Sequence, residues 1–103
     1  MTRTLINELN THIGETVTIK AIVDVRRDQG KMAFFDFRDR TGIVQGVVFD
    51  KPEVLDIAKE ASNESAVMVM GVVNKRPEKM VNDKVLNGDI ELEITGITIL
   101  NRA

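Results

Sequence analysis

Alternation of apolar and polar residues with a period of two is the feature that most constrains how this chain folds. From Thr16 onward, one set of alternating positions holds Val17, Ile19, Ala21, Val23 and Val25, and the other holds Thr18, Lys20, Ile22, Asp24 and Arg26. Successive side chains of a strand point to opposite faces, so this segment predicts a half-buried strand. Residues 32–39 and 43–49 alternate in the same way, and the segments 28–31 and 39–42 predict tight turns between the three strands.

Two segments have helical spacing instead. A short N-terminal helix that ends near Gly14 is predicted by Leu5, Ile6, Leu9 and Ile13. The segment 50–63 predicts an amphipathic helix of about three turns. Its expected N-cap is Asp50, with Glu53 reaching back to the Asp50 amide.

Two further strands follow the second helix. Residues 66–73 are apolar on both faces, and Met68 and Met70 are expected to fill the core. The last strand begins at Asp89, and Gly96 predicts a bulge in it. Three strands, one helix and two strands is the order typical of the OB-fold, a five-stranded Greek-key barrel that binds oligonucleotides or oligosaccharides. We therefore predict an all-β fold and a single domain over residues 1–103.

The composition excludes several classes of protein. The chain has no cysteine, which excludes disulfides, thiolate zinc sites and cysteine nucleophiles, and its single histidine, His12, excludes a histidine metal cluster. The longest apolar runs fall far short of the roughly 20 residues that cross a bilayer, and no export signal begins the chain. We therefore expect a soluble cytoplasmic protein with no membrane partner. The net charge of −2 argues against a general nucleic-acid coat, which is normally basic.

Phe34 is the anomaly with the most bearing on function. Strand parity places Phe35 and Phe37 inside the barrel, so Phe34 is expected on the opposite, polar face. There it would offer a stacking platform worth about 1–3 kcal/mol per base. The alternative is that Phe34 packs under a loop or the N-terminal helix. Gln45 on the next strand is expected nearby, and its amide suits a base edge, although taken alone it is more simply a solvated side chain.

Charged residues of both signs surround these positions. The basic ones form two groups, Arg26, Arg27, Lys31, Arg38 and Arg40, and then Lys75, Arg76, Lys79 and Lys84. Aspartates interleave with the first group, so most of its members are expected in surface ion pairs of small energetic value. Glu91 and Glu93 alternate outward on the last strand, where an exposed face lacks the pocket that acid–base catalysis needs. A carboxylate there can accept hydrogen bonds from guanine, although solubilising charge is the simpler interpretation.

Residues 26–45 carry the pattern RRDxGxxxFxDxRDxxGxxQ, and the second half of the chain contains Arg76-Pro77-Glu78, Asn82, Gly88 to Leu92 and Ile99 to Ala103. At these spacings the chain resembles the N-terminal anticodon-binding domain of bacterial aspartyl-tRNA synthetase. The resemblance covers nearly the whole chain and implies an OB-fold that recognises the tRNA anticodon.

The resemblance also implies anticodon contacts for six residues: Phe34, Gln45, Arg27, Glu91, Arg76 and Asn82. Phe34 would stack on the middle base, a uracil, with Gln45 and Arg27 hydrogen-bonding around it. Glu91 would accept from the guanine in the first position, and Arg76 and Asn82 would lie near the third base. The chain departs from the family pattern at Ala21-Ile22, Val47 and Asn74-Lys75, which trims the predicted binding face.

The catalytic domain of a class II synthetase, which supplies the ATP and Mg²⁺ sites in the family, has no counterpart in these residues. We therefore expect that this chain alone neither aminoacylates nor holds a cofactor. It is either one domain of a longer enzyme, which the ending Asn101-Arg102-Ala103 favours, or a free-standing relative. The resemblance implies tRNA and the catalytic domain as partners, with homodimerisation only through other regions.

Two other functions fit the same barrel. A general single-strand binder predicts a steep salt dependence and little base preference. A protein-interaction barrel predicts that Ile22, Met32 and Val47 form one exposed apolar patch.

Overall fold

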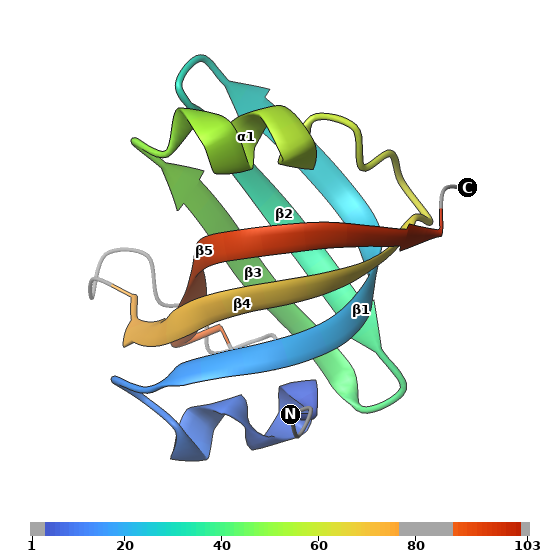
Figure 1. Ribbon diagram of the computed structural model, residues 1–103. Coiled ribbons are helices and arrows are strands. Elements are labelled where there is room, and N and C mark those ends of the chain that lie inside the picture. The colour runs from blue at the N-terminus through green and yellow to red at the C-terminus, as the bar shows by residue number, and fades with distance from the viewer. Residues whose placement is uncertain (1–3, 77–87, 102–103) are drawn as a thin grey trace.

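The chain folds into a closed barrel (Figure 1). The computed structural model describes residues 4–76 and 88–101, and these form η1 (Ile6–Thr11), β1 (Thr16–Gln29), β2 (Met32–Asp39), β3 (Gly42–Phe49), α1 (Pro52–Ala58), β4 (Ala66–Lys75) and β5 (Ile90–Asn101). The strand order is β1-β2-β3-β5-β4, and β4 pairs back to β1. The β3–β5 pair is parallel and the others are antiparallel. The predicted OB-fold, with a helix between β3 and β4, is confirmed.

Phe35 and Phe37 of β2 stack in the core, with their ring centroids 5.2 Å apart. Both side chains are fully buried, as the alternation of β2 predicts. Gly46 of β3 makes room for them, because a Cβ atom at this position would lie only 2.5 Å from the Phe37 ring. The inner faces of all five strands contribute to the same apolar cluster, together with residues of η1 and α1.

A bulge in β1 reverses the predicted alternation after Val23. The register against β2 shifts between Val23 and Val25, so that Val25, expected in the core, is 36% exposed. Arg26, expected on the outer face, instead donates hydrogen bonds to the carbonyl oxygens of Lys59 and Ala61. One extra residue in one strand turns every later side chain to the opposite face. The predicted positions of Val25 and Arg26 are therefore wrong.

The predicted N-terminal helix is a 3-10 helix, η1. Three residues per turn bring Ile6 and Leu9 onto one buried face, whereas Ile13, expected beside them, is 38% exposed. The turn between β2 and β3 anchors η1, because the Ile6 amide donates to Asp39 Oδ2 at 3.0 Å and the Asn7 amide donates to the Thr41 hydroxyl.

The second helix, α1, is shorter than the three turns predicted, since it ends at Ala58. Its predicted cap is also wrong. Asp50 has a φ of 56°, in the left-handed region, and not the extended conformation of an N-cap residue. The N-cap residue is Lys51, directly before Pro52, and its side chain makes no capping hydrogen bond. Neither of the two described helices is long and apolar enough to cross a membrane.

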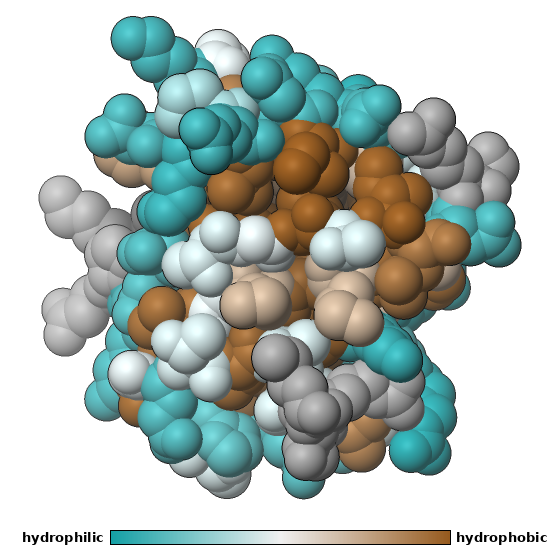
Figure 2. All heavy atoms as spheres, viewed as in Figure 1, coloured by the Kyte–Doolittle hydropathy of each residue, from teal (hydrophilic) through white to brown (hydrophobic). Residues whose placement is uncertain are grey.

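The predicted bulge beside Gly96 is confirmed. The register of β5 against β4 shifts there, leaving Thr95 as the extra residue, and its hydroxyl donates to the Met70 carbonyl oxygen. Met68 and Met70, expected in the core, lie on the outer face of β4, and Met70 is 40% exposed. They line a shallow surface hollow between α1 and β5, where Figure 2 shows hydrophobic side chains gathered.

Candidate nucleic-acid interface

A groove of about 540 Å³ crosses the outer surface of β2, β3 and β5. Eight residues line it: Met32, Phe34, Val47, Phe49, Asp50, Lys51, Glu91 and Glu93. Strands β2 and β3 supply apolar side chains, and β5 supplies two carboxylates. A groove with an aromatic wall and hydrogen-bond acceptors has the chemistry to hold an unstacked base.

Phe34 lies on the outer face of β2, as strand parity predicts. Its side chain is half-buried and lines the groove, while its neighbours Phe35 and Phe37 are buried in the core. Across the sheet, Phe34 pairs with Arg27 of β1 and with Val47 of β3. Neither η1 nor a described loop lines the groove beside it, apart from Asp50 and Lys51 at the start of α1. Phe34 is therefore placed to meet a ligand that enters the groove.

Gln45 is on the same outer face but is not the direct neighbour of Phe34. It pairs with Asp36, so it lies diagonally from Phe34, and it does not line the groove. Its side chain is half-buried. Diagonal neighbours on a sheet face are about 7–8 Å apart, which keeps Gln45 within reach of the edge of a base stacked on Phe34.

Arg27 reaches the outer face because of the bulge in β1. Strict alternation from Val23 would point Arg27 inward, but the extra residue pairs it with Phe34 instead. Its side chain is exposed, and no acidic side chain in the described part of the chain forms an ion pair with it. Arg27 is therefore a cation beside the aromatic ring that is available to a ligand.

Glu91 and Glu93 point outward, as predicted, but the face is not the open surface that we expected. Both side chains are half-buried in the groove. Burial raises the pKa of Glu91, the Arg76 guanidinium opposes this rise, and the Glu93 carboxylate adds to it. No hydrogen-bond donor among the described residues reaches the Glu91 carboxylate. Glu91 is thus a desolvated acceptor that a donor on a ligand can satisfy.

Glu93 is held in place by two neighbours. Its Oε1 accepts a hydrogen bond from Asn74 Nδ2 at 3.4 Å, and its Oε2 lies 3.7 Å from Lys51 Nζ. A metal site is not formed by the two glutamates, because no cluster of three potential ligands occurs within residues 4–76 and 88–101. The two carboxylates therefore differ: within the described residues, Glu93 has a hydrogen-bond donor and an ammonium group as partners, and Glu91 has neither.

Arg76, another predicted site residue, directly follows β4 and lies beside Ile90 at the start of β5. Arg76 is half-buried, and its Nε donates to the Ile90 carbonyl oxygen at 2.9 Å, which holds the guanidinium near Glu91. Asn82 lies outside the described residues, as do Lys79 and Lys84.

Among the groove residues that the sequence did not single out as binding residues are Phe49 and Lys51. Phe49 is 57% exposed and lines the groove at the end of β3. The alternation of β3 carries the signal, because Phe49 shares its face with Gln45 and Val47. Lys51 had no comparable signal, since its position depends on how α1 meets the barrel.

Comparison with known proteins identifies the fold more closely. The tRNA-anticodon family model, described as an OB-fold nucleic-acid-binding domain, matches residues 17–100. The chain belongs to this family.

The relatives of this OB domain confirm the predicted resemblance to aspartyl-tRNA synthetase. An aspartate–tRNA ligase of Listeria monocytogenes is 47% identical over 91% of this chain, and an asparagine–tRNA ligase of Desulforamulus reducens is 40% identical over 100% of it. These matches span only 16% and 23% of the relatives. The solved aspartyl-tRNA synthetase of Entamoeba histolytica superposes with a TM-score of 0.88 at 26% identity, over 100% of this chain and 22% of that one.

The OB domain does not form the apolar patch that a protein-interaction barrel predicts. Met32 and Val47 line the groove, and Val47 is only 8% exposed. Ile22 lies in a different hollow, beside Arg38 and Leu100. The three residues are therefore not one surface.

Proposed function

We propose that this OB domain is the anticodon-recognition module of an aspartate- or asparagine-specific tRNA ligase, and that an unstacked anticodon base binds on Phe34. The observation that carries the proposal is the position of Phe34 in the groove, between the exposed Arg27 of β1 and the two carboxylates of β5, Glu91 and Glu93. The family of the domain and its relatives support the choice of tRNA as the ligand.

Stacking supplies the larger part of the binding energy in this proposal. A base on an aromatic side chain contributes about 1–3 kcal/mol by alanine substitution. The exposed Arg27 adds a cation beside the base and its phosphate. Gln45 then offers both a donor and an acceptor to the Watson–Crick edge of a uracil on Phe34.

Glu91 provides a second element of base selection. A guanine presents an N1–H and an exocyclic amine, and both donate to a carboxylate. Because Glu91 is partly desolvated and has no donor among its described neighbours, the ligand donor gains more there than at a solvated carboxylate. Arg76 stays near Glu91, and we propose that it contributes to the site of the third base together with Asn82.

The charges of the groove argue against a general single-strand binder. Such proteins track the phosphate backbone with a positively charged groove. Here β5 contributes two carboxylates to the groove, and the net charge of the chain is −2. Selection by base contacts, with few phosphate contacts, fits this distribution better.

The rest of the activity is assigned to other parts of the enzyme. We propose that a class II catalytic domain, outside these residues, binds ATP and Mg²⁺ and transfers the amino acid in the cytoplasm. This division explains why the OB domain needs no strongly basic surface of its own.

Binding to the anticodon stem-loop of an aspartate tRNA tests the proposal. Fluorescence anisotropy is measured for the natural loop and for loops in which the middle uracil is replaced by each other base. We expect each replacement to weaken binding by about 1–3 kcal/mol, with a shallow dependence on salt. Equal binding of all four loops would show that the domain does not select this base.

A further inference from the structure

Phe49 has no role in the site described so far. Of the large apolar side chains in the described segments, it has the greatest exposed fraction, 57%. It belongs to the same face and the same groove as Phe34. Phe34 pairs with Val47 and Phe49 pairs with Met32, so the two rings are diagonal neighbours on adjacent strands.

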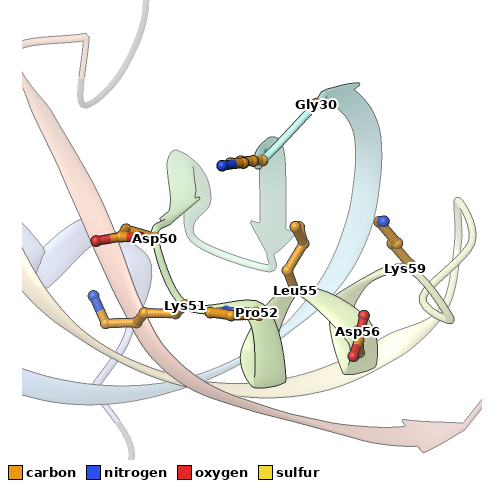
Figure 3. A pocket seen from close by; sticks show the side chains of 8 residues that line it. Gly30, Asp50, Lys51, Pro52, Leu55, Asp56 and Lys59 are labelled. Carbon is orange, nitrogen blue, oxygen red and sulfur yellow. The ribbon is translucent and has the colours of Figure 1, made fainter.

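A second pocket adjoins the groove at this end. Its volume is about 360 Å³, and it lies between the β1–β2 turn and α1. Asp50 and Lys51 line both the groove and the pocket, so the two hollows are neighbours. Figure 3 shows Asp50 and Lys51 at one side of the pocket and Lys59 at the other.

The pocket is lined by charged side chains of both signs. Three lysines line it, Lys31, Lys51 and Lys59, against the two aspartates Asp50 and Asp56. Lys51 is paired with Glu93. Lys31 and Lys59 are exposed, and neither forms an ion pair within the described part of the chain. Two ammonium groups are therefore available to an anion close to an exposed aromatic ring.

From these observations we propose a second nucleotide subsite, in which a base stacks on Phe49 and its phosphate lies in the lysine-lined pocket. This inference rests on the proposed function, because it extends the path of the same RNA across the groove. An aromatic side chain beside unpaired cations is the combination with which single-stranded nucleic acid is held. An apolar protein surface would cover Phe49 but would leave the lysines without a partner.

A double-mutant cycle between protein and RNA tests the base contact. Each nucleotide of the anticodon stem-loop is made abasic in turn, and binding is measured for the wild-type chain and for Phe49→Ala. At one position other than the uridine, we expect the missing base to weaken wild-type binding about 5- to 150-fold and binding of the variant by no more than about twofold.

Matched variants separate stacking from packing. Phe49→Tyr keeps the aromatic ring and should keep the coupling, whereas Phe49→Leu keeps apolar area and should lose it. Ile57→Ala removes another exposed apolar side chain, 42% exposed and outside the groove, and should behave as wild type. If no loop nucleotide shows coupling to Phe49, the proposed subsite is wrong. Phe49 would then be assigned to a contact with a protein surface.

Salt dependence tests the phosphate contact. Lys31→Gln and Lys59→Gln should each reduce the slope of log K against log salt by up to about 0.7, the value for one single-strand phosphate contact. Lys20→Gln, which lies in a different hollow, is the control and should leave the slope unchanged. Unchanged slopes in both pocket variants would overturn the role of the pocket. Failure of the proposed function is distinguishable from these results, because then replacement of the uracil has no effect even in the wild-type chain.

Discussion

Arg27 and Phe34 face one another across β1 and β2 on the outer surface of the barrel, and the bulge after Val23 is what brings them together. Without the extra residue, Arg27 would share the inward face of Val23. The same bulge therefore sets the direction of two arginines. Arg26 points toward the residues that follow α1, and Arg27 lies beside Phe34 of the groove.

Phe34→Ala should weaken binding of the anticodon stem-loop by about 1–3 kcal/mol while changing the free energy of unfolding little, because the ring lies outside the core. The matched control is its neighbour Phe35→Ala, which should destabilise the fold by about 3–5 kcal/mol because Phe35 is fully buried. Anisotropy and urea denaturation measure the two quantities. Loss of the fold in Phe34→Ala, or unchanged binding, would contradict the stacking role.

Arg27→Ala and Arg26→Ala should have opposite effects. Arg27 is exposed beside Phe34, so its removal should weaken RNA binding by about 1–2 kcal/mol and leave stability within about 0.5 kcal/mol. Arg26 donates to the carbonyl oxygens of Lys59 and Ala61, so its removal should destabilise the fold by about 1–3 kcal/mol. If both variants lost binding equally at full stability, the assignment of the two arginines to different faces would be wrong.

Stability should depend on Asp39 at low pH. Burial raises the pKa of Asp39, but hydrogen bonds from the Thr41 hydroxyl and from the Ile6, Thr41 and Gly42 amides outweigh burial and lower it. The ionised carboxylate therefore stabilises the fold above the unfolded-state pKa, and this contribution is lost as the pH falls through the lower folded-state value.

Asp39→Ala tests this dependence by urea denaturation between pH 7 and pH 2. We expect a loss of about 1–2 kcal/mol at pH 7, because three amides lose their acceptor, and a smaller difference from wild type at pH 2. Asp28→Ala removes only an exposed carboxylate 3.4 Å from Arg26 and should cost less than about 1 kcal/mol. A constant Asp39→Ala effect across this pH range would contradict the role of ionised Asp39.

RNA binding should weaken as the pH falls because of Glu91. Burial raises the pKa of Glu91, so it is protonated at a higher pH than an ordinary glutamate, for which the pKa is about 4.3. Only the carboxylate accepts both guanine donors, so affinity should decline as the pH falls through the raised pKa of Glu91. Glu91→Gln should bind more weakly at pH 7 and lose this decline, whereas a decline that persists in the variant would assign it to another group.

Local periodicity explains why much of the fold could be predicted. The period of two in β2 depends only on residues within the strand, so the inward Phe35 and Phe37 and the outward Phe34 followed from the sequence. The same holds for the outward Glu91 and Glu93. The turns are equally local, because Gly30 takes a positive φ of 66° between β1 and β2.

What only the tertiary structure decided depends on contacts between residues far apart in the chain. Arg27 lies on the outer face because of the bulge in β1. The preceding residue, Arg26, points the other way and donates hydrogen bonds to carbonyl groups more than 30 residues away. Glu91 is partly buried on β5, which pairs with β3. Glu93 of β5 pairs with Lys51, which lies at the start of α1. By itself, the sequence determined which side chains of β2 leave the barrel, and that Glu91 and Glu93 of β5 do so. Packing between distant elements decided which of them share one groove, because no local pattern encodes the register of β3 against β5 or the angle at which α1 meets the barrel.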